Sequence, residues 1–385
     1  VDPCWKAMLA EVAEEIATGR MAGPFRAPED WPVRTVSAPQ FAHLETLLPL
    51  PEGDVLAAFA FSVQQTSADG TEKVRRCEDW KRSHHNSTFA AQDVPLHHSV
   101  QAYVDACIWL HEAGFEPMIS GQDLQGAYRQ WPIREPRHAY LIICTPAGPM
   151  LFRHHTMPFG AAASVWQFNR IIDALMYLCR NLLFLALIHY VDDLGLVAAI
   201  QDSAWSHKAF SRLCSLLEIQ LKPTKEQTPA RAQRIQGVII VVGASGITVQ
   251  PDPDRVRKLV NEIQNVLLEG SLDPDAAARL AGKLAFVATT LFGRLGKGPL
   301  APLYKRAHQA GGTELTPVLI TSLRTLTRIL QLSAPRFCPF PSHKPYVATI
   351  YADAFFQAGD DAKLGRKRSP HNLENGWGFI CRTEP

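Results

Sequence analysis

The spacing of apolar and polar residues along the chain predicts where helices and strands form. Two strand-like apolar segments, 118–133 and 182–200, flank a helical one, and the second is interrupted by Asp192 and Asp193. Val238–Val242 is a β-branched run typical of a further strand. Helical spacing is found in three segments: 5–18, 163–183 and 207–219. The order of these elements predicts an α+β fold.

Two later helices have clear start signals. Asp252-Pro253-Asp254 and Asp273-Pro274-Asp275 each place an aspartate at the N-cap and a proline at the first helical position. The first helix carries an apolar stripe and is expected to end at Gly270, a residue type that commonly follows a helix. We expect a pair of helices from residue 253 to about 290.

Glycine and proline indicate the segments between elements. Gly19–Pro32 is rich in both and is predicted to be irregular. In 308–343 a helix is followed by a proline-rich stretch, which is typical of a linker. A new domain is therefore expected to begin near residue 345.

The overall composition is that of a globular protein and does not identify a function. The chain has 385 residues, of which 46% are hydrophobic and 20% charged, and its formal net charge is +2. So small a charge does not indicate a nucleic-acid binder, although Lys73–Arg82 holds five basic and two acidic residues. A functional hypothesis must therefore rest on where the charges lie.

Cysteine spacing and apolar run length bear on the cellular compartment. The eight cysteines form no Cys-x-x-Cys pair or Cys/His cluster, which argues against a zinc site and a disulfide scaffold and favours a reducing compartment. The longest apolar run, Leu182–Ile188, is far shorter than the roughly 20 residues of a membrane helix. We expect an intracellular protein, cytoplasmic or nuclear, with no membrane partner. Because the chain begins at Val1 and stops after a strand-like segment, we interpret it as a fragment of a longer product.

The sharpest local feature is Tyr190-Val191-Asp192-Asp193, which lies between two apolar runs. Adjacent apolar runs of this length are expected to pair as a hairpin, but Asp-Asp is not the pair that a plain two-residue turn prefers. Two neighbouring carboxylates on an apolar hairpin repel each other and lose hydration, which a divalent cation would compensate. A solvated acidic turn is the alternative interpretation.

A second candidate carboxylate, Asp123, follows a strand-like segment upstream. Two magnesium ions about 3.5–4 Å apart need carboxylate oxygens from separate elements, because one hairpin cannot surround both ions. Asp123 could supply the second side. Taken alone, Asp123 is better explained as a helix N-cap or turn residue.

Several segments, in order, resemble the motifs of the reverse transcriptases of retroviruses and retrotransposons. Asp123–Tyr128 resembles their first catalytic motif, Met157–Gly160 the second and Tyr190–Asp193 the third. Leu221–Lys225 and Ile235–Ile239 resemble the later palm motifs. The order and spacing of the segments also resemble those of the family.

The resemblance covers roughly residues 70–306, beginning with a fingers-like segment at Arg75–Lys81. It implies a right-hand polymerase fold with fingers, a palm whose antiparallel sheet carries the Asp-Asp hairpin, and a helical thumb. Leu280–Leu284 with Phe292–Arg294 is similar to the DIRS-like group of retroelements. The implied domains are an N-terminal extension (1–54), fingers and palm (55–240), thumb helices (241–310), a linker or connection (311–344) and a truncated RNase H-like α/β segment (345–385).

The activity that the resemblance implies is RNA-directed DNA polymerisation. The enzyme would add deoxynucleotides to a primer 3′-hydroxyl by two-metal phosphoryl transfer. Its partners would be an RNA or DNA template with a primer and deoxynucleoside triphosphates, and its cofactor two Mg²⁺ ions, with Mn²⁺ as an alternative. The implied metal ligands are Asp123, Asp192, Asp193 and the carbonyl of Leu124.

Further residues are implied in nucleotide binding. Tyr128 would lie beneath the sugar and clash with a 2′-hydroxyl, the group that separates ribonucleotides from deoxyribonucleotides; a packed core aromatic is the alternative. The others are Lys73 and Arg75 at the triphosphate, Phe159 and Gly160 beside the nucleotide, and Lys225 near the leaving pyrophosphate. For Lys73 and Lys225, a solvated surface lysine is the alternative.

Two more features extend the resemblance beyond the palm. Between Asp254 and Arg306 there are nine Lys/Arg and five Asp/Glu residues, which is consistent with thumb contacts to phosphates. Asp353, in the strand-like run Tyr346–Phe355, would be the first metal-binding carboxylate of RNase H. Because no other acidic residue after 345 lies in a matching context, we expect no RNase H activity.

Two other hypotheses remain open at this point. The chain could be a catalytically silent, reverse-transcriptase-like scaffold that binds nucleic acid, which would predict loss of the catalytic carboxylates. It could also be a decayed element copy that folds without activity. All three carboxylates are present, which favours the enzyme.

Overall fold

The computed structural model describes residues 1–26, 48–49, 56–66, 72–91, 93, 95, 97–291, 296–309, 312–332, 334–341, 348–356 and 375–383, with the backbone alone for the last two stretches. These residues form helices and mostly antiparallel sheets, so the predicted α+β fold is confirmed. They divide into two compact units, 1–339 and 340–385. Each described helix is too short or too polar to span a lipid bilayer.

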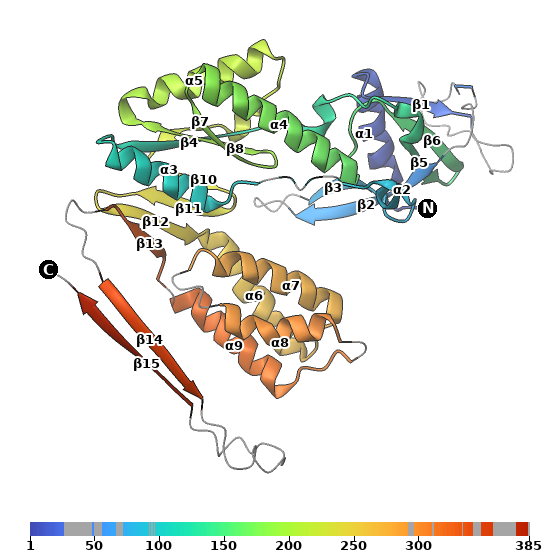
Figure 1. The fold of residues 1–385 in the computed structure, drawn as a ribbon. Helices are drawn as coiled ribbons and strands as arrows, with labels where there is room; N and C mark the ends of the chain where they lie inside the picture. Colours follow the sequence, from blue (N-terminus) through green and yellow to red (C-terminus); the bar gives the residue numbers. More distant parts are fainter. Residues whose placement is uncertain are drawn as a thin grey trace. The chain divides into compact units, whose positions relative to one another are not determined.

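The N-terminal sheet has the strand order β1-β6-β5-β2-β3 (Figure 1). Helix α1 packs on this sheet through Leu9 and Val12. We predicted an irregular segment at Gly19–Pro32, but its residues 21–25 form strand β1. The edge position of β1 explains why Pro24 is tolerated in it; residues 27–32 lie outside the described residues. The elements of this region are α1 (Trp5–Ala17), β1 (Met21–Phe25), β2 (Ala57–Thr66), β3 (Glu72–Glu78), α2 (His85–Thr88), η3 (Pro136–His138), β5 (Tyr140–Thr145) and β6 (Gly148–His154).

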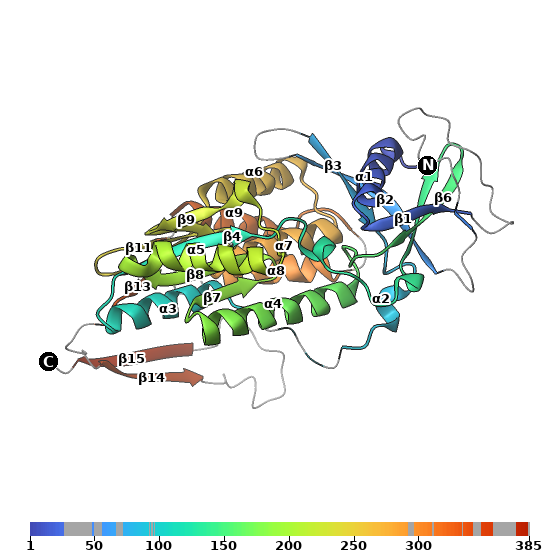
Figure 2. The same cartoon turned by 90° about the horizontal axis from the view of Figure 1, so that it is seen from above.

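The central sheet has the strand order β7-β8-β4-β9 and separates two layers of helix. Helices α4 and α5 lie over one face, as Figure 2 shows, and α3 lies on the other face. Leu187, Leu194 and Leu196 of the sheet pack against Phe168 of α4 and Phe210 of α5. The elements are α3 (Val100–Glu112), β4 (Pro117–Asp123), η2 (Ala127–Gln130), α4 (Ala162–Leu182), β7 (Ala186–Tyr190), β8 (Asp193–Ala199), α5 (Ile200–Leu216), η4 (Pro223–Lys225) and β9 (Gln227–Ala230).

Two predicted boundaries in this region were wrong. The strand predicted over 118–133 ends at Asp123, because Gly126 adopts a left-handed backbone (φ +72°) and a 3₁₀ turn follows. The helix predicted from 207 begins at Ile200, directly after β8. Ala199 at its N-cap has no capping side chain, so the sequence contains no start signal there.

A third sheet, β10-β11-β12-β13, leads into a group of helices that we call the helical bundle, α6–α9. The capping predictions are confirmed: Asp252 and Asp273 accept hydrogen bonds from the backbone N–H groups of Asp254 and Ala276, and Gly270 ends α6 with φ +68°. The elements are β10 (Ala232–Ile235), β11 (Val238–Val242), β12 (Gly246–Pro251), α6 (Pro253–Glu269), α7 (Pro274–Ala288), α8 (Lys297–Ala307), α9 (Pro317–Leu332) and β13 (Arg336–Pro339).

The segment that we expected to be a linker, 311–344, is largely built into these elements. Leu319 and Leu323 of α9 lie in the same buried cluster as Leu259 and Leu280 of α6 and α7. Strand β13 pairs with β12. Pro335 directly precedes β13 and Pro339 is its last residue, so this part of the segment is built into a sheet.

The described residues of the second unit form one antiparallel pair, β14 (Ala348–Phe356) and β15 (Asn375–Thr383). Asp353 lies opposite Gly378 in its register. The segment 357–374 between the strands lies outside the described residues.

Candidate active site

The hairpin predicted around Asp192 forms between β7 and β8. Tyr190 and Asp193 are the last paired residues, and Val191 and Asp192 make the turn. Val191 has φ +54°, which is rare for a β-branched side chain and costs conformational energy. A turn kept in this conformation is consistent with a functional constraint on where the aspartates lie.

Asp123 lies directly opposite Asp193 across the pairing of β4 and β8. Opposite residues of an antiparallel pair project from the same face, with Cβ atoms about 4.5–5.5 Å apart. Asp192 precedes Asp193 in the turn. We call Asp123, Asp192 and Asp193 the carboxylate centre. Residues from two separate elements thus meet at one end of the central sheet, as predicted for a shared site.

The carboxylate centre carries more negative charge than its surroundings compensate. Burial raises the pKa of Asp192 and of Asp193 above the ordinary range; the charge of Asp123 adds to both shifts, and the charge of Asp192 adds to that of Asp193. Among the described residues, Lys225 is the cation that forms an ion pair with this centre, through Asp123. Its hydrogen bond to Asp123 raises the pKa of Lys225. Three carboxylates therefore face one ammonium group.

Backbone contacts hold Lys225 beside the centre. Lys222 N–H donates to the carbonyl of Asp123 (2.8 Å), and Leu124 pairs with Leu221 through an isolated β-bridge. Asp123 is 7% exposed, whereas the Lys225 side chain is 58% exposed. Because it is so exposed, Lys225 contributes little to stability, and its position matters more for charge than for packing.

The ligand atoms that the carboxylate centre offers are oxygens, the type that binds a hard divalent cation. Carboxylate oxygens, with a neighbouring backbone carbonyl such as that of Leu124, are the ligands that Mg²⁺ prefers. No group of three or more His, Cys, Asp or Glu side chains is arranged as a ready-made metal site in the described part of the chain. The ammonium of Lys225 lies on Asp123, where a cation would be needed.

Tyr128 lies in the 3₁₀ turn η2 that follows Asp123, close to Phe159. The ring centroids of Tyr128 and Phe159 are 5.2 Å apart, and Tyr128 also packs edge-on against Phe168 at 4.8 Å. Burial, and to a lesser extent the charge of Asp192, raises the pKa of the Tyr128 hydroxyl. Phe159 is 51% exposed. Tyr128 is thus packed and also close to the carboxylate centre.

The backbone of Gly160 lies so close to its neighbours that a larger residue would crowd them. Its φ is +83°, and an added Cβ would lie 3.3 Å from the Glu78 carbonyl and from the Trp80 ring. Lys73 and Arg75 are exposed on β3, and the described contacts do not connect either of them with the carboxylate centre. The neighbouring Arg76 is buried.

One close contact beside the centre was not predicted from the sequence. Gly195 of β8 lies two residues after Asp193, on the same face of the sheet, and pairs with Gly121 of β4. A Cβ on Gly195 would fall 2.2 Å from the hydroxyl of Tyr103, which is fully buried on α3. A glycine inside a strand is a signal for such an approach, but the sequence does not reveal its partner.

The carboxylate centre opens onto two adjoining clefts. One, of about 550 Å³, is lined by Asp123, Asp193 and Lys225. The other, of about 1210 Å³, extends from Asp193 and Gly237 to Arg255 on α6 and to Phe286 on α7. Asp193 and Gly237 line both clefts. The centre is therefore accessible to a large ligand.

Neither a protein-family model nor a curated protein matches this chain.

Proposed function

We propose that this chain is a reverse-transcriptase-type polymerase that extends a primer with deoxynucleotides on an RNA or DNA template. The observation that carries the proposal is the cross-strand pairing of Asp123 with Asp193, next to Asp192 in a strained turn. Such a centre, under-compensated in charge and open to large clefts, suits the binding of metal-bound phosphates.

In this proposal the central sheet corresponds to a palm, the N-terminal sheet to fingers and the helical bundle to a thumb. The bundle that would act as the thumb then includes α9, beyond the limit of 310 that the sequence suggested. Residues 345–385 would correspond to the first strands of an RNase H-like domain, with Asp353 on the first of them.

The carboxylate centre would hold the metal ions of the reaction through Asp123, Asp192 and Asp193, with the Leu124 carbonyl nearby. When bound, Mg²⁺ would supply charge neutralisation for the primer 3′-oxygen and the triphosphate. The side chains keep their negative charge fixed at one end of a rigid sheet, so little reorganisation is needed during the reaction.

Lys225 and Tyr128 would act on the nucleotide. Lys225, which pairs with Asp123 in this structure, would donate hydrogen bonds to the leaving pyrophosphate as negative charge develops there, if Asp123 instead held a metal ion. Tyr128, held by Phe168 and Phe159, would present its ring to the sugar and exclude a 2′-hydroxyl.

The larger cleft would receive the primer-template duplex between the hairpin and the helical bundle. Arg255 lies against Gly237, where an added Cβ would fall 2.3 Å from its guanidinium, and it stacks 4.6 Å from the Phe286 ring centroid. A guanidinium fixed in this way at the wall of the cleft is suited to contact a phosphate.

A primer-extension assay with Mg²⁺ and all four deoxynucleoside triphosphates tests the proposal. We expect extension on an RNA and on a DNA template, lost when EDTA removes the metal. Template binding without any extension, in Mg²⁺ or Mn²⁺, would instead support a catalytically silent nucleic-acid-binding scaffold.

A further inference from the structure

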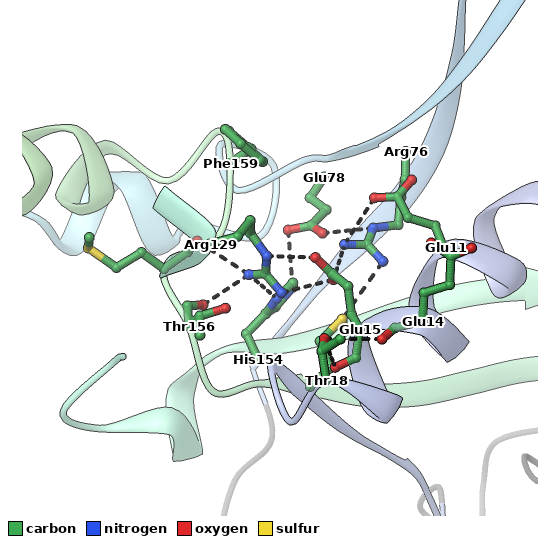
Figure 3. Close-up of polar contacts among 12 residues, drawn as sticks. Glu11, Glu14, Glu15, Thr18, Arg76, Glu78, Arg129, His154, Thr156 and Phe159 are labelled. Atoms are coloured by element: carbon green, nitrogen blue, oxygen red, sulfur yellow. Dashed lines mark hydrogen bonds and ion pairs between the residues drawn. The ribbon is translucent and has the colours of Figure 1, made fainter. Parts of the chain in front are cut away.

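A cluster of buried charges connects the N-terminal helix with the segments that carry Tyr128 and Phe159 (Figure 3). The carboxylate of Glu15 accepts hydrogen bonds from Nε (2.7 Å) and Nη2 (2.8 Å) of Arg129, and from Nη2 of Arg76 (2.8 Å). Both arginine side chains are only 4% exposed. We call Glu15, Arg76, Glu78, Arg129 and His154 the charged cluster.

Arg129 holds two segments together. It follows Tyr128 in η2, and its Nη1 donates to the carbonyls of Thr156 (3.0 Å) and Met157 (3.3 Å). The segments also pair through their backbones, since Met157 N–H donates to the carbonyl of Trp131 (2.9 Å). The turn that carries Tyr128 is therefore fixed against the segment that leads to Phe159.

A second route reaches Phe159 through Arg76. Nε of Arg76 lies 3.1 Å from Glu78, whose other carboxylate oxygen accepts from the Trp80 indole N–H (3.0 Å). The same N–H also donates to the carbonyl of Phe159 (3.0 Å). Glu15 thus reaches the Tyr128–Phe159 ring pair by two chains of charged or polar contacts.

The balance of charge makes Glu15 the member on which this arrangement depends. Two guanidinium groups and the imidazole of His154, whose Nε2 lies 3.2 Å from Glu78, face two buried carboxylates, Glu15 and Glu78. Glu11 is more exposed and lies 3.6 Å from Arg76. Without the charge of Glu15, the two guanidinium groups would share Glu78 and repel each other in a site that excludes water. Arg129 interacts less directly with Glu78 than Arg76 does, because no described ion pair joins Arg129 and Glu78. Arg129 would therefore be the group that moves.

We infer that Glu15 is a positioning residue that fixes Tyr128 and Phe159 and thereby sets how strongly the site favours deoxynucleotides over ribonucleotides. This inference rests on the proposed polymerase function. It assigns a role in substrate selection to the N-terminal helix α1, whose sequence pattern alone carries no chemistry.

The test compares Glu15→Gln with Glu14→Gln, which removes the same charge from an exposed position on the same helix. For each, the kcat/KM for a deoxynucleotide is divided by that for the matching ribonucleotide. This ratio does not depend on the fraction of folded enzyme. For Glu15→Gln we expect the ratio to fall about tenfold, with a KM for the deoxynucleotide that rises about tenfold and a kcat that changes less than about threefold. Glu14→Gln should resemble the wild type.

A second variant tests the same inference if Glu15→Gln does not fold. Glu15→Gln/Arg76→Gln removes one buried charge of each sign, so the cluster stays balanced while Arg129 still loses its carboxylate partner. It should show the same loss of discrimination. A wild-type ratio in Glu15→Gln, or in the double variant, would overturn the inference while the polymerase assignment stands.

Hydrogen–deuterium exchange provides a readout that needs no activity. In Glu15→Gln, the amides of Trp131 and Met157 should exchange faster than in Glu14→Gln, because their segments are no longer held by Arg129. Unchanged exchange at both would overturn the positioning role. If the wild type does not extend primers, the proposed function fails, and the exchange result alone then decides whether Glu15 fixes these segments.

Discussion

In the charged cluster around Glu15, two guanidinium groups face two carboxylates, whereas in the carboxylate centre three carboxylates face one ammonium group. The pKa directions follow this difference. Burial alone would raise the pKa of Glu78, but His154 and Arg76 outweigh burial and lower it to about 2. Burial and neighbouring carboxylates raise the pKa of Asp192 and Asp193.

The difference distinguishes a structural ion network from a site that needs a further cation. A balanced buried cluster stabilises one conformation and needs nothing from outside the chain. An unbalanced one is destabilising unless a ligand completes it, which is the usual condition of a functional site. The two regions should therefore respond in opposite ways when one carboxylate is neutralised.

The largest effect is expected from Asp123→Asn. It removes the charge opposite Asp193 and the partner of Lys225, and we expect primer extension to fall at least about 10³-fold. Lys225→Met, which leaves all three carboxylates, should cost only about 10- to 100-fold. Single-turnover extension measures both, and equal losses would show that the carboxylate is not the dominant group.

Neutralisation within the balanced cluster should reduce stability. Glu78→Gln leaves a guanidinium group without its buried partner, and we expect a loss of about 3 kcal/mol in the free energy of unfolding at pH 7. Because the pKa of Glu78 is depressed in the folded protein, its stabilising contribution is present above about pH 4.5 and is lost as the pH falls toward about 2. Denaturant titrations at several pH values should show the wild-type and variant curves converging across that range. A constant gap would contradict this account.

Tyr128→Ala tests whether the ring acts on the sugar or only fills the core. If it acts on the sugar, discrimination against ribonucleotides should fall about 10- to 100-fold, by more than deoxynucleotide use declines. Single-nucleotide extension gives both values. Unchanged selectivity would return Tyr128 to a packing role, with Phe168 as its main partner.

The smallest expected effect has the opposite sign. Asp193→Asn should stabilise the metal-free protein at pH 7 by about 0.5–1 kcal/mol, because it removes repulsion inside the centre. The pKa of Asp193 is raised in the folded protein, so the penalty is absent below about pH 3.8 and grows as the pH rises. Thermal unfolding without divalent cations measures the change, and destabilisation by this variant would mean that the centre is already balanced.

Local signals in the sequence predicted the features that depend on neighbouring residues. The Asp-Asp hairpin, the N-caps Asp252 and Asp273 and the helix end at Gly270 all arise from a few adjacent side chains. The start of α5 was misplaced because no capping side chain precedes it. Its position is set by the end of β8 and by burial of residues such as Phe210.

Contacts between distant residues could not be predicted in this way. Glu15 and Arg129 are 114 positions apart, and nothing in either local pattern indicates that they meet. The close contact between Tyr103 and Gly195 is a second example. The glycine suggests a close approach, but only the packing of α3 on the central sheet identifies its partner. The residues of the carboxylate centre could be proposed from sequence, whereas the groups that position them required the fold.

Primer extension by the wild type and by Asp192→Asn, at equal protein concentration with Mg²⁺, tests the central claim most directly. We predict extension by the wild type and none above background for Asp192→Asn, with binding of the primer-template duplex retained in both. If Asp192→Asn extends the primer as much as the wild type does, the assignment of the carboxylate centre as the active site is contradicted.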